Sequence, residues 1–374
     1  MRILRRVLVG LAVALGVLLV AGGGWVLFML FWNPRVPPAA PRVETRAPRS
    51  DTVTVVLAGD FAPTDAALAR IAREGWRAPY LGTADLLRDA DVAFANLEAP
   101  VTESHDRFPL YKDYIYRVEP AATEAWRWLG LDVVSLANNH IIDYRERGVR
   151  DTVRHLDAAG IAHVGAGAGE SEARRPVIFD VGGVTIGFLA YLEDKVAYNL
   201  YLRTFAVGGR VGAAKLDLRD LREDVARLRP LVDVLIVSVH WGMNYQDVTG
   251  EQERLARALV AAGVDVIAGH HSHDVQRVEV RGRTILLYSL GNWAWGAPGH
   301  GELRVGLIAR LGIRGGRVAT LELLPIATQN RIVDYQPRPV AAEELGWLDD
   351  FLARSRAHGT SLQVVNGVVE VQLD

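Results

Sequence analysis

The stretch "LDVVSLANNHIID", residues 131–143, joins an apolar strand pattern to a polar turn. Its first half is rich in valine and leucine, as expected of a strand buried on both faces. Asn138, Asn139 and His140 then follow in a row, and their amide and imidazole groups end that pattern. In open α/β sheets, ligands bind beyond the carboxyl ends of the strands. The stretch therefore predicts an α/β fold with polar groups gathered at one edge of a sheet.

Other apolar runs end in polar residues in the same way. "TVTVVLAGD" ends at Asp60, "DVAFANLE" ends at Glu98, and "DVLIVSVH" ends at His240. "VDVIAG" is followed by "HHSH", which contains His271 and His273. Helical patterns lie between these runs, for example "EQERLARALVAAG". Short apolar strands that alternate with helices predict a sheet buried on both faces.

Later segments have the pattern of antiparallel hairpins. Strand-like runs flank the turn residues Gly182-Gly183, Arg281-Gly282 and Gly315-Gly316. Glycine supplies the backbone conformations that tight hairpin turns need. The sequence therefore predicts two mixed sheets that pack face to face, with helices on the outside.

The polar residues at the strand ends have the chemistry of a metal site. Carboxylates and neutral imidazoles bind borderline divalent metals, and one carboxylate can bridge two ions. His271 and His273 are two apart, so in an extended segment both face one side. Each residue alone is better explained as a turn, a helix cap or a core histidine than as a metal ligand. It is the series of strand ends that predicts the metal site.

Composition excludes several other classes. The 374 residues are half hydrophobic, which is ample for a large core. The formal net charge of −2 gives no basic field for nucleic acid, so no nucleic-acid partner is expected. The chain has no cysteine, which excludes disulfides, thiolate catalysis and cysteine metal sites.

The N-terminus predicts a membrane anchor. Residues 7–32 carry no charge, and about 20 apolar residues suffice to cross a bilayer. Arginines precede the run and aromatic residues crowd its far end. We expect a single-pass cell-membrane protein, held in the lipid bilayer by this helix, with its body on the extracytoplasmic side. An unusual cleaved signal would place the body in the same compartment.

The chain divides into four parts on these patterns. Residues 1–32 are the cytoplasmic stub and anchor, and 33–50, with five prolines, read as an extended linker. Residues 51–338 form the main α/β domain. Residues 339–374 are a helix–strand extension to which no chemistry can be assigned.

Taken together, the strand-end motifs resemble a known family. "VVLAGD", "DVAFANLEAPVT", "GLDVVSLANNHIID", "VSVHWGMNYQ", "AAGVDVIAGHHSHDVQ" and "LLYSLGNW" occur in an order and spacing similar to the CapA family, within roughly residues 52–296. These are poly-γ-glutamate capsule biosynthesis proteins, a branch of the calcineurin-like metallophosphatase fold. The resemblance implies a four-layer α/β/β/α sandwich with mixed sheets.

The resemblance also implies roles for individual residues. The implied metal ligands are Asp60, Glu98, Asn139, His240, His271 and His273, with Glu98 bridging two divalent ions (Mn, Fe or Zn). His140 is the implied leaving-group acid or transition-state donor, and Asp143 its orienting partner. The chain departs from the phosphatase pattern at Ala62, where a histidine is usual, at Glu98, where aspartate is usual, and at His270, where glycine is usual.

Three functions fit this reading. The first is metal-dependent hydrolysis of a phosphoester linked to a capsule or wall polymer. The second is a noncatalytic polymer-binding or scaffold component of a membrane synthesis complex, with an anionic polymer and membrane synthases as partners. The third is a surface protein whose metals only stabilise the fold.

Two further segments are secondary candidates. Lys112, in "YKDYIY", could steer an anionic group, although a solvated edge lysine is the simpler expectation. Asn292, Trp293 and Trp295, in "SLGNWAWG", could wall the site, although packing is the simpler expectation.

Overall fold

The computed structural model describes residues 36–108, 112–297 and 305–373. The expected membrane anchor at 1–32 lies outside these described residues. Within the described ranges, no helix is both long enough and apolar enough to cross a bilayer.

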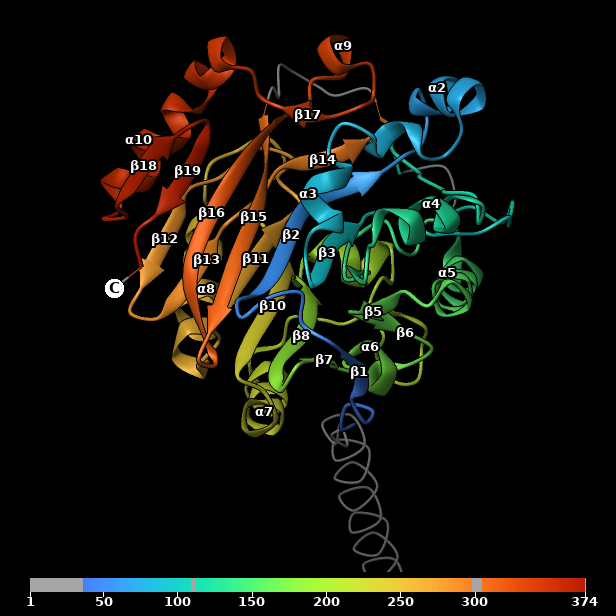
Figure 1. Ribbon diagram of the computed structural model, residues 1–374. Helices are drawn as coiled ribbons and strands as arrows, with labels where there is room; N and C mark the ends of the chain where they lie inside the picture. Colours follow the sequence, from blue (N-terminus) through green and yellow to red (C-terminus); the bar gives the residue numbers. More distant parts are fainter. Residues whose placement is uncertain (1–35, 109–111, 298–304, 374) are drawn as a thin grey trace, which may run out of the picture. The chain divides into compact units, whose positions relative to one another are not determined.

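A seven-stranded mixed sheet forms one half of the body (Figure 1). In spatial order its strands are β1 (Arg42–Arg46), β7 (Val177–Val181), β8 (Val184–Leu192), β10 (Val234–His240), β11 (Val266–His270), β13 (Thr284–Leu287) and β12 (Val278–Arg281). The β8, β10, β11 and β13 strands are parallel to one another. His240 and His270 are register partners at the carboxyl ends of β10 and β11.

A ten-stranded mixed sheet forms the other half. Its main path is β18 (Leu362–Val365), β19 (Val368–Val371), β16 (Arg317–Ala327), β15 (Val305–Arg314), β2 (Val53–Ala62), β3 (Val92–Leu97), β4 (Val133–Ser135) and β5 (Ala162–Val164). Two short strands join it at the side: β14 (Asn292–Trp295) pairs with β2, and β17 (Arg338–Pro339) pairs with β16. The β2 to β5 strands are parallel, so their carboxyl ends meet at one edge.

Helices and short segments complete the described chain. The helices are α2 (Ala67–Glu74), α3 (Ala84–Arg88), α4 (Ala122–Leu129), α5 (Arg145–Ala159), α6 (Glu170–Ala173), α7 (Leu218–Leu228), α8 (Gly250–Ala262), α9 (Asn330–Val333) and α10 (Asp349–Ala357). Short helical turns lie at η1 (Ala78–Tyr80), η2 (Ala197–Tyr201), η3 (Arg229–Leu231) and η4 (Ala342–Leu348), and β6 (Ala166–Gly167) pairs with β9 (Gly212–Ala213).

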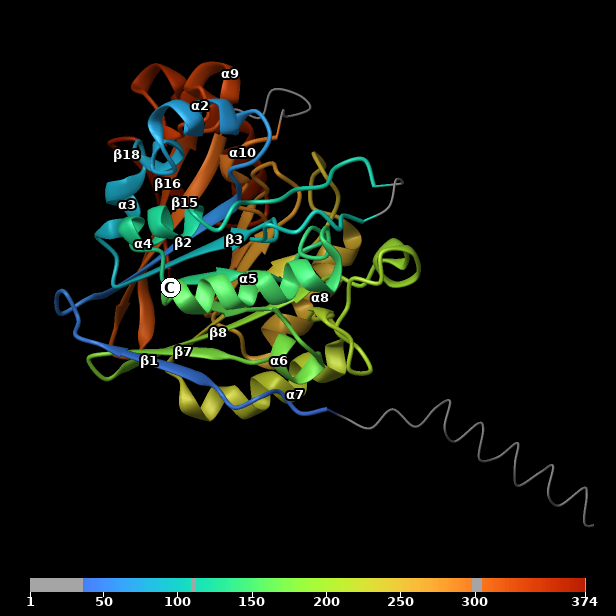
Figure 2. The ribbon, with the colours of Figure 1, turned by 90° about the vertical axis from the view of Figure 1, so that its right-hand side faces the viewer.

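The two large sheets pack face to face, as the sequence predicts. The rings of Phe94 on β3 and Phe188 on β8 stack with centroids 5.7 Å apart. On the outer face of the seven-stranded sheet, Val237 packs in one apolar cluster with residues of α7 and α8. On the outer face of the ten-stranded sheet, Phe61 contacts Trp126 of α4 at 5.4 Å. Figure 2 shows β2 and β3 on one side of β7 and β8, with α7 beyond them.

The predicted hairpins and the helix predicted from "EQERLARALVAAG" are confirmed. The Gly182-Gly183, Arg281-Gly282 and Gly315-Gly316 pairs join β7 to β8, β12 to β13 and β15 to β16. The α8 helix starts with a capping box between Thr249 and Gln252 and ends at Gly263, whose φ of 87° suits glycine.

Part of the expected linker belongs to the body. Residues 42–46 lie within the proline-rich range 33–50, yet they form β1 and pair in parallel with β7. Arg46 fixes this strand through an ion pair of 2.6 Å with Asp132 and by lying over the ring of Phe179. Proline-rich sequence and an edge strand are both extended, so composition alone does not distinguish them.

The C-terminal segment 339–374 is likewise integrated with the body rather than appended to it. The β18–β19 hairpin extends the ten-stranded sheet beside β16. Ser355 of α10 accepts a hydrogen bond of 3.0 Å from the backbone N–H of Val278, and Phe351 is buried. The sequence shows these elements but not the partner strands that they join.

Candidate metal centre

Asp60 lies between the two sheets because β2 alternates its side chains. Phe61 faces the outer helices, so Asp60 faces the seven-stranded sheet. One carboxylate oxygen of Asp60 accepts a hydrogen bond of 2.8 Å from Asn96 and lies 3.0 Å from Nδ1 of His270. The other accepts a bond of 3.0 Å from the N–H of His271. Burial alone would raise the pKa of Asp60, but the hydrogen bond and charge of His270 outweigh it, so the pKa is lowered.

Glu98 follows β3 on the same face as Phe94 and Asn96, again because strand side chains alternate. Its side chain has no exposed surface, and neither carboxylate oxygen has a hydrogen-bond partner among the described residues. Burial and the nearby charge of Asp60 raise the pKa of Glu98 well above its usual value. A buried carboxylate without a partner is costly, and a cation is the partner that removes the cost.

Glu98 is shared by two groups of side chains that could each hold a metal ion. The first group is Asp60, Glu98 and His273, and the second is Glu98, His240 and His271. In each group the ligand atoms lie within 4.8 Å of one another. A carboxylate common to both groups is the arrangement of a two-metal site.

Asn139 lies beside the second group. Its side-chain oxygen is 2.7 Å from Nε2 of His240, and that same nitrogen is 3.4 Å from Oε1 of Glu98. Burial lowers the pKa of His240 and of His271 well below the usual value. Both imidazoles are therefore neutral at pH 7, which is the form that binds metal.

His271 and His273 reach the site by a different route from the one expected. The β11 strand ends at His270, and His271 and His273 have φ values of 93° and 60°. They lie in a turn rather than on one face of an extended segment. Nδ1 of His273 is 3.0 Å from the side-chain oxygen of Asn292, which leaves its other ring nitrogen for a ligand.

His140 and Asp143 form the second part of the site. Nδ1 of His140 lies 2.7 Å from the Asp143 carboxylate, while Nε2 faces Glu98 at 4.0 Å. Burial, together with the charge of Lys112, lowers the pKa of His140 to about 4, against the opposing effect of Asp143. Asp143 thus lies where the resemblance places an orienting partner.

Lys112 is not a solvated edge lysine. Its ammonium group pairs with Asp143, donates to the backbone oxygen of Asn139 at 2.8 Å and lies 3.3 Å from Nδ1 of His140. Its side chain is 11% exposed. The steering role that the sequence offered as a secondary candidate stays a prediction, since Asp143 already pairs with this ammonium group.

Other residues near the site had weaker signals in the sequence. Asn96 bridges Asp60 and Asn138 through its amide, and Lys195 lies 3.1 Å from Nε2 of His271. Trp295 packs against His273 at 4.5 Å and so lines the site, whereas Trp293 packs against Phe61 in the core. The only sequence signal for Asn96 as a site residue is that it is a polar residue within an apolar strand pattern.

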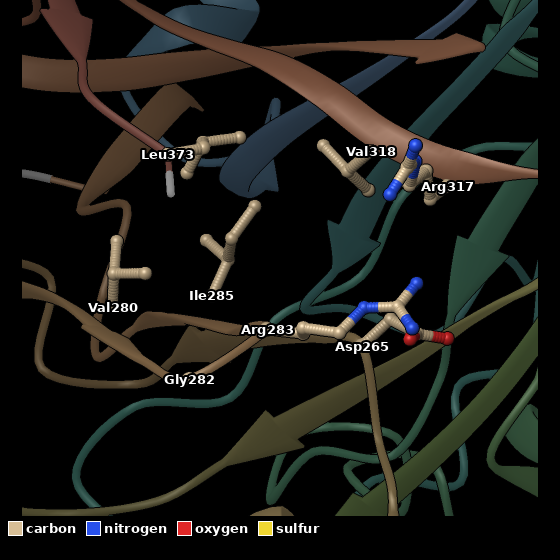
Figure 3. Close-up of a pocket in the computed structure, with 8 residues that line it drawn as sticks. All are labelled: Asp265, Val280, Gly282, Arg283, Ile285, Arg317, Val318 and Leu373. Atoms are coloured by element: carbon tan, nitrogen blue, oxygen red, sulfur yellow. The ribbon is translucent and has the colours of Figure 1, made fainter.

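A separate cavity of about 110 Å³ lies away from this centre. Figure 3 shows Asp265, Arg283 and Arg317 among aliphatic side chains in its lining. Asp265 directly precedes β11, at the opposite end of that strand from His270. This cavity therefore takes no part in the candidate centre.

The profile of the family "Bacterial capsule synthesis protein PGA_cap" matches residues 54–296, which include every strand end described above. The chain belongs to the PGA_cap family. Among curated relatives, the "Capsule biosynthesis protein CapA" of Bacillus anthracis is 26% identical over 85% of this chain and 76% of its own length. A "Probable polyglutamine synthesis accessory protein" of Mycobacterium tuberculosis is 32% identical over 76% of this chain and 78% of its own.

Solved structures give weaker matches to this PGA_cap protein. A Staphylococcus aureus protein described as a candidate 5'-nucleotidase has 14% identity and a TM-score of 0.42, over 82% of this chain and 58% of that one. Yellow lupin purple acid phosphatase has 11% identity and a TM-score of 0.37, over 75% of this chain and 52% of that one. This chain thus spans less than two thirds of either protein.

Proposed function

We propose that this protein acts in the synthesis or export of an acidic capsule-type polymer, such as poly-γ-glutamate, as a metal-dependent phosphoester hydrolase of the metallophosphatase type. The observation that carries the proposal is the Glu98 carboxylate, which is fully buried, lacks a hydrogen-bond partner among the described residues and is common to two ligand groups. The relatives' names refer to capsule biosynthesis and polyglutamine synthesis, and the resemblance of the strand-end motifs adds poly-γ-glutamate.

The residues fit two divalent ions. Asp60, Glu98 and His273 would hold one, and Glu98, His240 and His271 the other, with the Asn139 oxygen beside it. Mixed carboxylate, amide and imidazole ligands suit Mn, Fe or Zn. Such ions, when bound, stabilise the negative charge that builds up on a phosphoester during hydrolysis.

His140 is the residue proposed to supply a proton to the leaving oxygen. Asp143 holds Nδ1, so Nε2 is the nitrogen that faces the metal ligands. Its low pKa means that the imidazole is neutral before substrate binds. A phosphoester anion beside the ring favours the charged imidazolium, so the proton is acquired as the substrate binds.

Metal analysis of the purified protein, paired with an assay on an aryl phosphate in manganese, tests this proposal. Wild-type protein is expected to bind metal and hydrolyse the ester, and Glu98→Ala is expected to lose both. If wild-type protein takes up no metal during incubation with Mn, Fe or Zn, the proposed site is refuted. Metal binding without turnover would refute hydrolysis alone.

One observation favours the noncatalytic alternative, a polymer-binding or scaffold component. Both oxygens of Asp60 already accept hydrogen bonds, and position 62 is alanine where a ligating histidine is usual in phosphatases. The first ligand group is therefore poorer than the second. Association with a membrane synthase, together with bound metal and no turnover, would support this alternative.

We also propose that the protein is anchored in the cell membrane by residues 1–32, with its body outside the cytoplasm. The support is the uncharged run from 7 to 32 and the arginines before it. This orientation places the metal centre where a capsule polymer emerges. A fusion reporter active only in the cytoplasm, joined after Asp374, tests it and is expected to be inactive.

A further inference from the structure

A groove of about 490 Å³ opens beside the turn that carries His140. Its floor includes Ile142 and Leu202, which come from the turn before α5 and from the loop after β8. Figure 2 shows that loop, in yellow-green, beside the N-terminal end of α5. The charged residues in its lining are Asp106, Arg145, Glu146, Arg147, Arg203 and Arg210.

The groove carries positive charge that the described residues do not neutralise. Arg145 pairs with Asp106 at 3.0 Å, and Arg147 lies 3.6 Å from Asp151. Arg203 has neither a hydrogen bond nor an ion pair with another described residue, and Arg210 donates only to the backbone oxygen of Val207, at 3.3 Å. Two guanidinium groups are therefore available to an anion.

Backbone conformation at the rim is unusual for the residues concerned. Arg145 has φ of 53° and Arg203 has φ of 51°, although neither is glycine. Such values are uncommon for residues with a long side chain. Both arginines line the groove, Arg145 at the start of α5 and Arg203 after η2.

The groove is linked directly to the proposed acid–base pair. The backbone N–H of Phe108, which lines the groove, donates to the backbone oxygen of Asp143 at 2.8 Å. The carboxylate of Asp143 contacts His140 and Lys112 on its other side. The groove therefore lies next to the turn that carries His140 and Asp143.

We propose that this groove, beside the metal centre, binds a segment of a carboxylate-bearing polymer such as poly-γ-glutamate. The proposal rests on the proposed function, because it assigns the groove to the polymer on which that site would act. Guanidinium groups bind carboxylate and phosphate oxygens in pairs of hydrogen bonds, so an anionic repeat unit fits either arginine. The apolar residues of the lining accommodate the methylene carbons that separate the charges of such a polymer.

Polymer binding to the full chain in detergent tests the groove. Poly-γ-glutamate and inorganic polyphosphate of matched charge are the probes, and the protein is kept in chelator so that metal ligands cannot contribute. Arg203→Gln combined with Arg210→Gln is expected to weaken binding about tenfold, as loss of charged hydrogen bonds at an exposed site would. The control, Arg222→Gln combined with Arg257→Gln, removes the same charge from α7 and α8.

Equal losses in the groove pair and the control pair would overturn the proposal, since binding would then follow net charge alone. No binding of either polymer by wild-type protein would also overturn it. Tighter binding of polyphosphate than of poly-γ-glutamate by wild-type protein would likewise overturn it, because the proposed occupant carries carboxylates. Polymer binding in chelator needs neither metal nor turnover. A failure of the groove proposal can therefore be told apart from a failure of the hydrolase proposal.

Discussion

Glu98→Gln should change the stability of the protein in opposite directions with and without metal. In chelator, the wild-type carboxylate is buried without a hydrogen-bond partner among the described residues, and its pKa is raised by burial and by Asp60. Because the pKa of Glu98 is higher in the folded protein than in the unfolded protein, protonation of Glu98 stabilises the fold. This stabilisation is complete below the unfolded-state pKa, about 4.3, and is lost as the pH rises toward the folded-state pKa. Glutamine has no such titration.

The size of the effect follows from linkage. Between the unfolded and folded pKa values of Glu98, the chelated wild type should lose ~1.4 kcal/mol of unfolding free energy per pH unit relative to Glu98→Gln. With metal at 100 times its Kd, the wild type gains about 2.7 kcal/mol. At ~2 °C per kcal/mol, that gain raises its Tm by about 5 °C. The variant lacks the shared ligand and should gain much less.

Thermal unfolding at several pH values between 4 and 8, with chelator and with manganese, measures both effects. Glu119→Gln is the matched control, because Glu119 is an exposed glutamate outside the centre. It should follow the wild type throughout. If Glu98→Gln is less stable than wild type in chelator at pH 8, the carboxylate is not an unpartnered charge. If manganese stabilises both proteins equally, Glu98 is not a shared ligand.

Three further predictions concern single sites and topology. His271→Ala should lose bound metal by elemental analysis, while His163→Ala, a partly buried histidine outside the centre, should keep it; equal content in both would remove His271 from the site. His140→Ala should keep its metal but lower turnover of an alkyl phosphate by ~10²–10⁴-fold, and less for a nitrophenyl ester, whose leaving group needs no proton; Asn139→Ala should instead lose metal, and metal loss in both would make His140 a ligand. Protease added to intact cells stripped of outer layers should release the body by cutting within 36–41, before the paired strand β1; protection until lysis would reverse the orientation.

The strand ends could be predicted because burial and alternation are written locally in the sequence. His240 ends β10, Glu98 directly follows β3 and Asp60 lies two residues before the end of β2, and parallel strands bring such ends to one edge. Contacts between distant segments could not be predicted in the same way. Lys112 was expected in solvent because nothing near it in sequence shows that Asp143 is buried beside it.

The edges of the sheets were harder to predict than their centres. Residues 42–46 have a linker composition, and only the neighbouring β7 strand makes them part of a sheet. The turn at His271 and His273 was also missed. An extended segment would direct both histidines toward one site, so the sequence pattern gave the correct destination with the wrong backbone. The positive φ values of both residues exclude the extended backbone.

The metal centre forms at the junction of the two sheets, and this determines when in folding it can exist. Asp60 and His271 meet although they are 211 residues apart in sequence. Contacts of such long range form slowly, since most of the chain must first be ordered. The complete ligand set is therefore assembled late, in whichever compartment the chain finishes folding. Similar ligands bind several divalent ions, so the metal supply of that compartment would select any ion that the candidate centre takes up.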